Sequence, residues 1–376
     1  MGDVGLGDLQ EIRAWANYQG HFVIVGQRNV KVGPDTTCCL SAIWTSDDAQ
    51  HWTLATVDGA ANKLVEIRDV AIGGPGLVAV GDESTATTVT AAVWTSTDGR
   101  RWDRVTSDGL SPGRMWRVGG TMHGLVALGD DCSCIYSDVV AAGADRGRDI
   151  MWTSVDGISW QRTTSPAGLT LLDGGILTNT NDEHTALVTR WEGPNPATRP
   201  IAVWRTTGGT DWRKVGELPG SAGADVWRVA GGTTGYVAIG TRVWTSADGV
   251  SWTVSSSASP GQISDVLALP NGFIAVGARS TATGCAVPES AFIGQTWVSA
   301  DGQSWREIVP KPAWVGQGVT GLFQTDGGIV GVGRSFTSHS DLAQGAVWTT
   351  NLTGSTTDPR PPASTPSPSP DSGCGP

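Results

Sequence analysis

Four charged residues lie at matching positions of a repeated segment: Asp69, Arg117, Arg228 and Asp265. Each comes shortly before an apolar run that ends in glycine. Two carboxylates and two guanidinium groups at one register of successive repeats can form an oriented polar site that binds a charged ligand. The alternative is a set of salt bridges that ties the repeats together, since charges with restricted access to water are usually paired.

Four tryptophans are further candidates for contact with a ligand. Trp191 and Trp314 lie in predicted connections between strands, where an exposed indole can stack on a sugar ring. Trp116 and Trp227 directly precede two of the charged residues. We interpret this second pair as packing between repeats rather than as ligand platforms.

Other patterns that carry catalysis or bind metals are absent from the sequence. The five histidines show neither His-Glu-x-x-His nor another pairing at the spacing of metal ligands. No Gly-x-Ser-x-Gly motif precedes a predicted helix, and the glycine-rich stretches are typical of hairpin turns. We therefore expect no metal ion and no cofactor, and the chain is more typical of a binding protein than of an enzyme.

The cysteines are predicted to lie in connections rather than in buried strands. Five of them are candidates for disulfide bonds: Cys38, Cys39, Cys132, Cys134 and Cys285. Loop positions and an even total of six favour disulfides, and hence a secreted or envelope-attached protein. A soft-metal site built from the Cys-Cys and Cys-x-Cys pairs is the alternative. The sequence begins without the features of a signal peptide, which we attribute to a truncated or misassigned start.

One short word built around tryptophan recurs through most of the chain at intervals of 40 to 58 residues. The leading tryptophans of its seven copies are Trp44, Trp94, Trp152, Trp204, Trp244, Trp297 and Trp348. Several short β-rich runs within each period of this length are typical of a β-propeller. The sequence therefore predicts an all-β fold, a seven-bladed β-propeller of four-stranded antiparallel blades.

The second copy shows how a blade is expected to form. Apolar runs at 67–72, 77–80 and 91–95 are separated by turn residues, and a fourth run begins at Trp102. Asp98-Gly99 predicts the last hairpin turn. Most of the length variation falls between the second and third strands, so we call the face that carries those connections the variable face. Binding surfaces usually lie on such loops, and the four charged residues are expected at the mouth of a central channel on that face.

Two segments are expected to differ from the regular repeats. Residues 1–353 are predicted to form the propeller, and residues 354–376 a disordered Pro/Ser/Thr-rich tail that cannot bury a core. The seventh copy lacks its second tryptophan, so its outer strand is expected to be missing. Residues 3–9 are predicted to supply that strand by pairing with residues 345–350, which would close the ring and protect its edge.

Charge and hydropathy limit the partners. A net charge of −11 and a pI near 4.8 argue against nucleic acid, whose phosphates are bound by clustered basic residues. No stretch approaches the ~18 consecutive apolar residues that predict a transmembrane helix. We expect a monomer whose ligand is a glycan or another protein.

The recurring word resembles the Asp-box, or BNR, repeats of the sialidase-like propeller superfamily. It reads Ser-x-Asp-Gly-x-x-Trp, as at Ser299–Trp305, and is one residue shorter between Asp and Gly than the family pattern. The resemblance spans nearly the whole chain and implies a structural turn in which the aspartate accepts backbone N–H groups. Sialidase activity would further imply three arginines, a tyrosine nucleophile and an aspartate acid/base. These catalytic residues are not matched, and Glu11–Trp15 lacks the Arg-Ile-Pro signature.

The sequence thus favours a binding propeller that displays a loop-built surface for a glycan or protein. A glycoside hydrolase or lyase of sialidase-like fold is the alternative. The two functions differ in one observable feature, because a glycosidase needs two carboxylates about 5 to 10 Å apart in a concave site.

Overall fold

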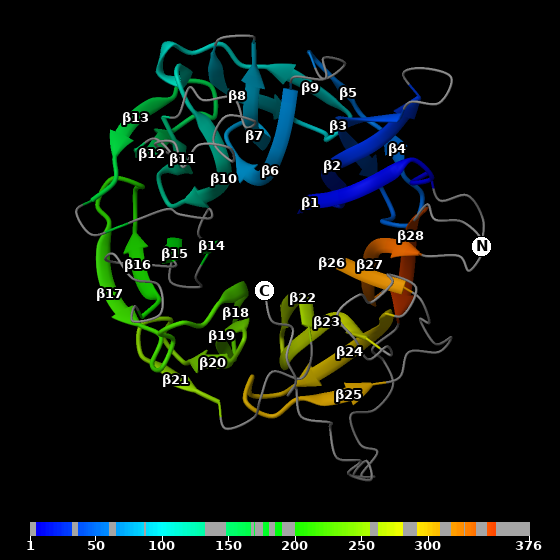
Figure 1. The fold of residues 1–376 in the computed structure, drawn as a ribbon, viewed down its shortest axis with the longest axis vertical. Helices are drawn as coiled ribbons and strands as arrows, with labels where there is room; N and C mark the ends of the chain where they lie inside the picture. Colours follow the sequence, from blue (N-terminus) through cyan, green and yellow to red (C-terminus); the bar gives the residue numbers. More distant parts are fainter. Residues whose placement is uncertain are drawn as a thin grey trace, which may run out of the picture.

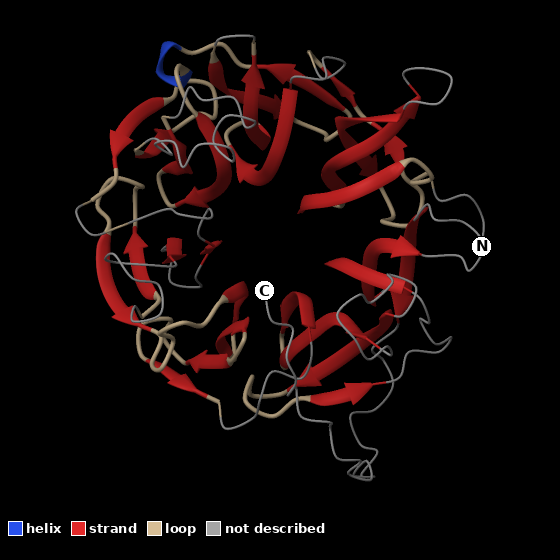
Figure 2. Ribbon diagram, viewed as in Figure 1, coloured by secondary structure: helices blue, strands red, loops and turns tan. Residues whose placement is uncertain are grey.

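Strands dominate the structure, and their sheets follow one another in a ring around a central axis (Figure 1). The single helical element of the described residues is a short 3-10 helix, η1 (Asp108–Leu110), drawn in blue in Figure 2. This is a computed structural model, and the residues that it describes are 5–31, 37–59, 65–85, 88–131, 148–166, 169, 176–179, 185–189, 200–255, 262–280, 292–308, 317–326, 328–335 and 344–350.

The first three sheets are blades 1, 2 and 3. Blade 1 contains β1 (Leu9–Tyr18), β2 (His21–Lys31), β3 (Thr37–Ser46) and β4 (Thr53–Leu54). Blade 2 contains β6 (Val65–Gly73), β7 (Gly76–Ser84), β8 (Val89–Ser96) and β9 (Arg101–Arg104), with the short β5 (Thr56–Val57) added in parallel to β9. Blade 3 contains β10 (Arg114–Thr121), β11 (Gly124–Asp130), β12 (Asp149–Ser154) and β13 (Gln161–Thr164).

The remaining sheets are blades 4, 5 and 6 and a smaller one that we call the closing sheet. Blade 4 contains β14 (Ile176–Asn179), β15 (Thr185–Thr189), β16 (Ala202–Thr206) and β17 (Arg213–Glu217). Blade 5 contains β18 (Val226–Gly232), β19 (Gly235–Gly240), β20 (Val243–Ser246) and β21 (Trp252–Val254). Blade 6 contains β22 (Gln262–Leu269), β23 (Gly272–Ser280), β24 (Phe292–Ser299) and β25 (Arg306–Ile308). The closing sheet contains β26 (Gln317–Thr325), β27 (Gly328–Ser335) and β28 (Gln344–Thr350).

The all-β propeller predicted from the sequence is confirmed, but the prediction of seven four-stranded blades is wrong. The described residues form six complete blades, each with a four-stranded antiparallel meander. The closing sheet has only three strands among these residues, and β27 is the hydrogen-bonded neighbour of its last strand. The seventh repeat therefore forms an incomplete sheet rather than a seventh blade, in keeping with the absence of its second tryptophan.

Burial between sheets explains why the second strands are continuous apolar runs. The first seven residues of β7 are all buried, since neighbouring blades cover both faces of that strand. One core cluster joins Val23 and Ile43 of blade 1 to Leu77 and Trp94 of blade 2. The leading tryptophan Trp94 is fully buried there, and its indole donates a hydrogen bond of 2.8 Å to the Asp58 carbonyl. Leading tryptophans thus help to fasten successive blades together.

The recurring Asp-containing word forms the turn between the third and fourth strands. In blade 3, Asp156 Oδ1 accepts the N–H groups of Ile158 at 2.8 Å and Ser159 at 2.7 Å. Ser154 Oγ donates to the same carboxylate at 3.1 Å, and the Trp160 indole donates to the Gly157 carbonyl at 2.9 Å. These hydrogen bonds lower the pKa of Asp156 to about 2. The expected structural role of this aspartate is therefore confirmed.

We expect Asp156→Ala to lower the free energy of unfolding at pH 7 by about 1 kcal/mol, the usual cost of losing a capping carboxylate. Because the folded-state pKa is depressed, the stabilisation is present above the unfolded pKa near 3.9 and is lost as the pH falls through about 2. Chemical denaturation at pH 7 measures the change. Asp103→Ala is the control, since Asp103 is an exposed aspartate outside the turns. Equal losses in the two variants would contradict a special role for the turn.

Residues 5–8 lead into β1 as a turn rather than as a strand. Leu6 is fully buried in a cluster that contains Trp44 and Trp52 of blade 1 and Phe323 of the closing sheet. The predicted pairing of residues 3–9 with 345–350 is not observed among the described residues. The seam between blade 1 and the closing sheet is instead packed by apolar side chains.

Three further predictions concern the C-terminal tail, the Cys38-Cys39 pair and the absence of a transmembrane helix. The tail at 354–376 lies outside the described residues. Cys38 and Cys39 were expected in a loop, and this is wrong, because both lie in β3 opposite Val30 and Asn29 of β2. In the described part of the chain, no helix is long and apolar enough to span a membrane.

Candidate functional site

Six inner strands carry an irregularity at the same place. In β1, β6, β10, β18, β22 and β26 the pairing with the second strand shifts by one residue shortly after the strand begins. In blade 3, for example, Met115 pairs with Gly129 and Arg117 with Leu128, so Trp116 is the extra residue. A β-bulge of this kind changes the direction of the side chains at and beside the extra residue.

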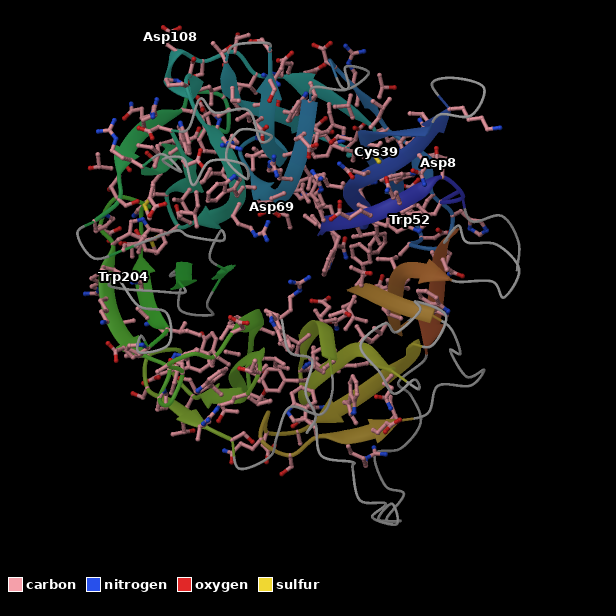
Figure 3. The ribbon with its side chains drawn as sticks, in the orientation of Figure 1. Asp8, Cys39, Trp52, Asp69, Asp108 and Trp204 are labelled. Atoms are coloured by element: carbon pink, nitrogen blue, oxygen red, sulfur yellow. The ribbon has the colours of Figure 1, made fainter. Side chains whose placement is uncertain are left out.

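The bulge lets two consecutive residues leave the packing between blades. In blade 3, Met115 and Val118 belong to a core cluster, whereas Trp116 and Arg117 between them do not. The corresponding pairs, which we call the inner ring, are Arg13-Ala14, Arg68-Asp69, Trp116-Arg117, Trp227-Arg228, Ser264-Asp265 and Thr320-Gly321. Ala14 alone among them is part of a core cluster. Asp69 is seen at the inner edge of blade 2, beside the centre of the ring (Figure 3).

Both aspartates of the inner ring connect one sheet to the next. Asp69 Oδ1 accepts the N–H of Val70, and Oδ2 accepts the N–H of Val118 in blade 3, each at 2.9 Å. Asp265 Oδ2 accepts the N–H of Leu322 in the closing sheet at 2.8 Å. Burial raises the pKa of both carboxyls, that of Asp265 to about 7, although nearby arginines favour the charged form. These aspartates thus link adjacent sheets through hydrogen bonds from backbone N–H groups, whereas the predicted structural alternative was a set of salt bridges.

The two arginines adopt the same arrangement in blades 3 and 5. Arg117 Nη1 donates to the Trp116 carbonyl at 3.0 Å, and Arg228 Nη1 donates to the Trp227 carbonyl at 2.9 Å. Arg228 Nε also lies 3.6 Å from Asp265 Oδ1. Burial lowers the pKa of Arg228, the charges of Asp265 and Asp69 oppose this, and the charge of Arg117 adds to the lowering. The two guanidinium groups are therefore close enough to repel each other.

Trp15 is a member of this site that the sequence did not reveal. The Arg228 Cζ atom lies 5.8 Å from the centre of the Trp15 ring, so Arg228 of blade 5 reaches toward blade 1. Trp15 also lies against Gly321, where an added Cβ would come within 2.8 Å of the indole. Ala14 and Gly321 are small residues of the inner ring, and their size was the only sign in the sequence that a large side chain, the Trp15 indole, lies beside them.

The structure therefore brings Asp69, Arg117, Arg228 and Asp265 into one electrostatic group, as their matching register suggested. Trp191, Trp314, Cys132, Cys134 and Cys285 lie outside the described residues.

A second charged group lies at the variable-face ends of the first two blades. Arg13 pairs with Glu66, and Arg68 Nε lies 2.5 Å from Asp82 Oδ1. Glu66 and Asp82 are directly opposite each other on β6 and β7, which brings two carboxylates to neighbouring positions. Each is already ion-paired with an arginine, and burial raises the pKa of Asp82. This geometry is that of ion pairs within and between blades.

Comparison with known proteins identifies the fold. No family model matches the chain, and no curated protein matches it in sequence. The chain is similar to YCF48 in a structure with a bound D1 peptide, at 15% identity and a TM-score of 0.52, covering 91% of this chain and 92% of that one. It is also similar to the β-propeller domain of the Trilobed protease from Pyrococcus furiosus, at 8% identity and a TM-score of 0.53, covering 91% and 93%.

A third similar structure is the periplasmic gluconolactonase PpgL from Pseudomonas aeruginosa, at 11% identity and a TM-score of 0.50, covering 80% of this chain and 84% of that one. At these identities the similarities show a shared β-propeller fold, and propellers support many different functions. The function must therefore be inferred from the residues of the inner ring.

Proposed function

We propose that the protein is a binding propeller that holds a carboxylate-bearing part of a glycan or protein ligand at the inner ring. Arg117 and Arg228 supply the positive charge, and Asp69 and Asp265 hold the ring in shape. The resemblance of the turns to Asp-box repeats supports the same class of propeller. In this proposal the protein works outside the cell or at its envelope, which rests on the disulfides expected from the cysteines.

The observation that carries the proposal is the state of the two arginines. A guanidinium has five N–H donors. The Arg117 guanidinium makes one hydrogen bond to a described residue, and that bond goes to the carbonyl of the preceding residue. Arg228 is equally short of hydrogen-bond acceptors, and its side chain is 35% exposed. A carboxylate placed between these groups would accept their free N–H groups and remove their mutual repulsion, which is a favourable basis for binding.

The hydrolase alternative receives less support from the same residues. The carboxylates of Asp69 and Asp265 accept backbone N–H groups from two sheets, so their oxygens are engaged in holding the ring. Glu66 and Asp82 are adjacent, as a retaining glycosidase would require, but both are ion-paired with arginine. Among the similar propellers, the one with a bound peptide is consistent with a protein ligand.

The proposal predicts that Arg117→Gln and Arg228→Gln each weaken the binding of carboxylate ligands by about tenfold or more, since a charge-assisted hydrogen bond contributes ~1.5–3 kcal/mol. Isothermal titration with a tetraglutamate peptide and with tetragalacturonate measures the effect. Arg306→Gln is the matched control, because it removes the same charge from the exposed outer strand β25. Unchanged affinity in both inner-ring variants, or no binding of either probe to the unmodified protein, would overturn the proposal.

A further inference from the structure

Trp116 and Trp227 differ from the other described tryptophans in their surroundings. Of the 18 tryptophans, Trp191 and Trp314 lie outside the described residues. Every other tryptophan but two belongs to a core cluster or packs against one. The two exceptions are Trp116 and Trp227, and both are partly exposed. The sequence-based interpretation of these residues as packing between repeats is therefore not supported by the described contacts.

The positions of these two tryptophans explain why they lie outside the core clusters of the described residues. Each is the extra residue of a bulge, immediately before an arginine of the inner ring. The residues at the same position elsewhere in the ring are polar: Arg13, Arg68, Ser264 and Thr320. The same bulge position therefore carries a polar side chain in four sheets and a large indole in the other two. Exposed aromatic surface at such a position is typical of a contact with a ligand.

The two Trp-Arg pairs lie on either side of one strand. Strand β14 of blade 4 contacts both β10, which carries Trp116 and Arg117, and β18, which carries Trp227 and Arg228. Arg117 and Arg228 are close enough for the charge of Arg117 to lower the pKa of Arg228. One ligand lying over this part of the ring can therefore contact both pairs.

We propose that Trp116 and Trp227, with Arg117 and Arg228, form a site for an acidic glycan built from uronic acid residues. This inference rests on the proposed function and specifies its ligand. A flat indole offers an apolar face to the C–H groups of a pyranose ring, and its rigidity limits the entropy lost on binding. A guanidinium binds a carboxylate through two parallel hydrogen bonds. A uronic acid presents a pyranose face and a carboxylate in one residue.

An acidic peptide is the competing ligand, and the two tryptophans distinguish it from a glycan. Its carboxylates would satisfy the arginines, but they would leave both indoles without a flat surface to cover. The net charge of −11 opposes polyanions at long range, so recognition must depend on close contacts of this kind. Two stacking faces beside two guanidinium groups therefore favour the acidic glycan.

The test compares the same two probes in tryptophan variants. We expect Trp116→Ala and Trp227→Ala each to weaken the binding of tetragalacturonate about tenfold or more, at the ~1–2 kcal/mol level of an aromatic contact. Phenylalanine at either position should retain most of the affinity. Val254→Ala is the control, since it truncates an exposed apolar side chain on the outer strand β21, away from the inner ring. Near-ultraviolet circular dichroism establishes that each variant is folded.

The outcomes separate this inference from the proposed function. Binding of tetraglutamate but not of tetragalacturonate would overturn the glycan site and leave the carboxylate site standing. Tetragalacturonate affinity unchanged by both alanine variants would also overturn it, whatever the arginine variants do. Failure of both probes to bind the unmodified protein would overturn both proposals. Selective loss of tetragalacturonate binding in the alanine variants, with tetraglutamate unaffected, is the result that supports the site.

Discussion

Trp94→Ala should lower the free energy of unfolding by about 3–5 kcal/mol, the range for removing a large buried aromatic side chain. Trp94 is fully buried between blades 1 and 2, in a cluster with Val23, Leu77 and Trp102. Removing it leaves a cavity at the junction of two blades and deletes the hydrogen bond to Asp58. Chemical denaturation measures the loss as a lower midpoint with an unchanged slope.

Two matched variants define what the loss means. Trp94→Phe keeps most of the ring but not the indole N–H, so we expect a smaller loss, on the order of 1–2 kcal/mol. Val254→Ala truncates a side chain that is 44% exposed on β21, and should change the stability by less than about 0.5 kcal/mol. A loss below 1 kcal/mol for Trp94→Ala would contradict the view that the leading tryptophans hold adjacent blades together.

The propeller fold and the matching positions of its four inner charged residues could be predicted from the sequence. Asp69, Arg117, Arg228 and Asp265 interrupt inner strands that also carry buried apolar residues, so a charge there must serve the centre of the ring or a partner. The bulge that turns these residues inward has no sequence signature of its own, although it recurs in six described inner strands. The charged residues could be recognised without that signature because they occupy equivalent positions in successive repeats.

Other features of the site and fold could not be predicted, because they depend on contacts between residues of different strands or blades. Trp15 lies one position beyond the inner-ring pair of β1, and its contacts come from blade 5 and the closing sheet. The sequence predicts that Trp116 and Trp227 pack between repeats, and only the contacts of the described residues show that both lie outside the core clusters. The placement of Cys38 and Cys39 in a loop failed because β2 extends through polar residues to Lys31. Backbone pairing continued there without the apolar side chains that marked the other strands.

Asp265 should make the stability of the protein fall as the pH rises from 5 to 8. Burial raises the pKa of this carboxyl from its usual 3.8 to about 7, against the opposing effects of Arg228 and of the N–H groups of Leu322 and Val266. Between these two values the folded protein retains a proton that the unfolded chain releases. The folded state therefore binds more protons, and its stability decreases as the pH rises through this window. The full difference is on the order of 4 kcal/mol, about half of it between pH 5 and 7.

Asp265→Asn removes the titrating group, so the slope that it contributes between pH 5 and 7 should disappear. The amide has one oxygen in place of two, so the variant loses a hydrogen bond and its stability at pH 5 should be slightly lower than that of the unmodified protein. At pH 8 the order should reverse, because the variant no longer holds a buried negative charge. Denaturation curves at pH 5, 6, 7 and 8 measure both effects.

Asp103→Asn is the control, because Asp103 is exposed and its one ion pair with a described residue is with Arg101, at 3.0 Å. That variant should keep the pH dependence of the unmodified protein, since it replaces an exposed side chain outside the inner ring. An unchanged slope in Asp265→Asn would mean that Arg228 keeps Asp265 charged in the folded state. The distance of 3.6 Å between Arg228 Nε and Asp265 Oδ1 would then represent a full ion pair. Arg228 would be neutralised within the ring and less free to bind a ligand carboxylate, so the same titration also tests the charge available at the proposed site.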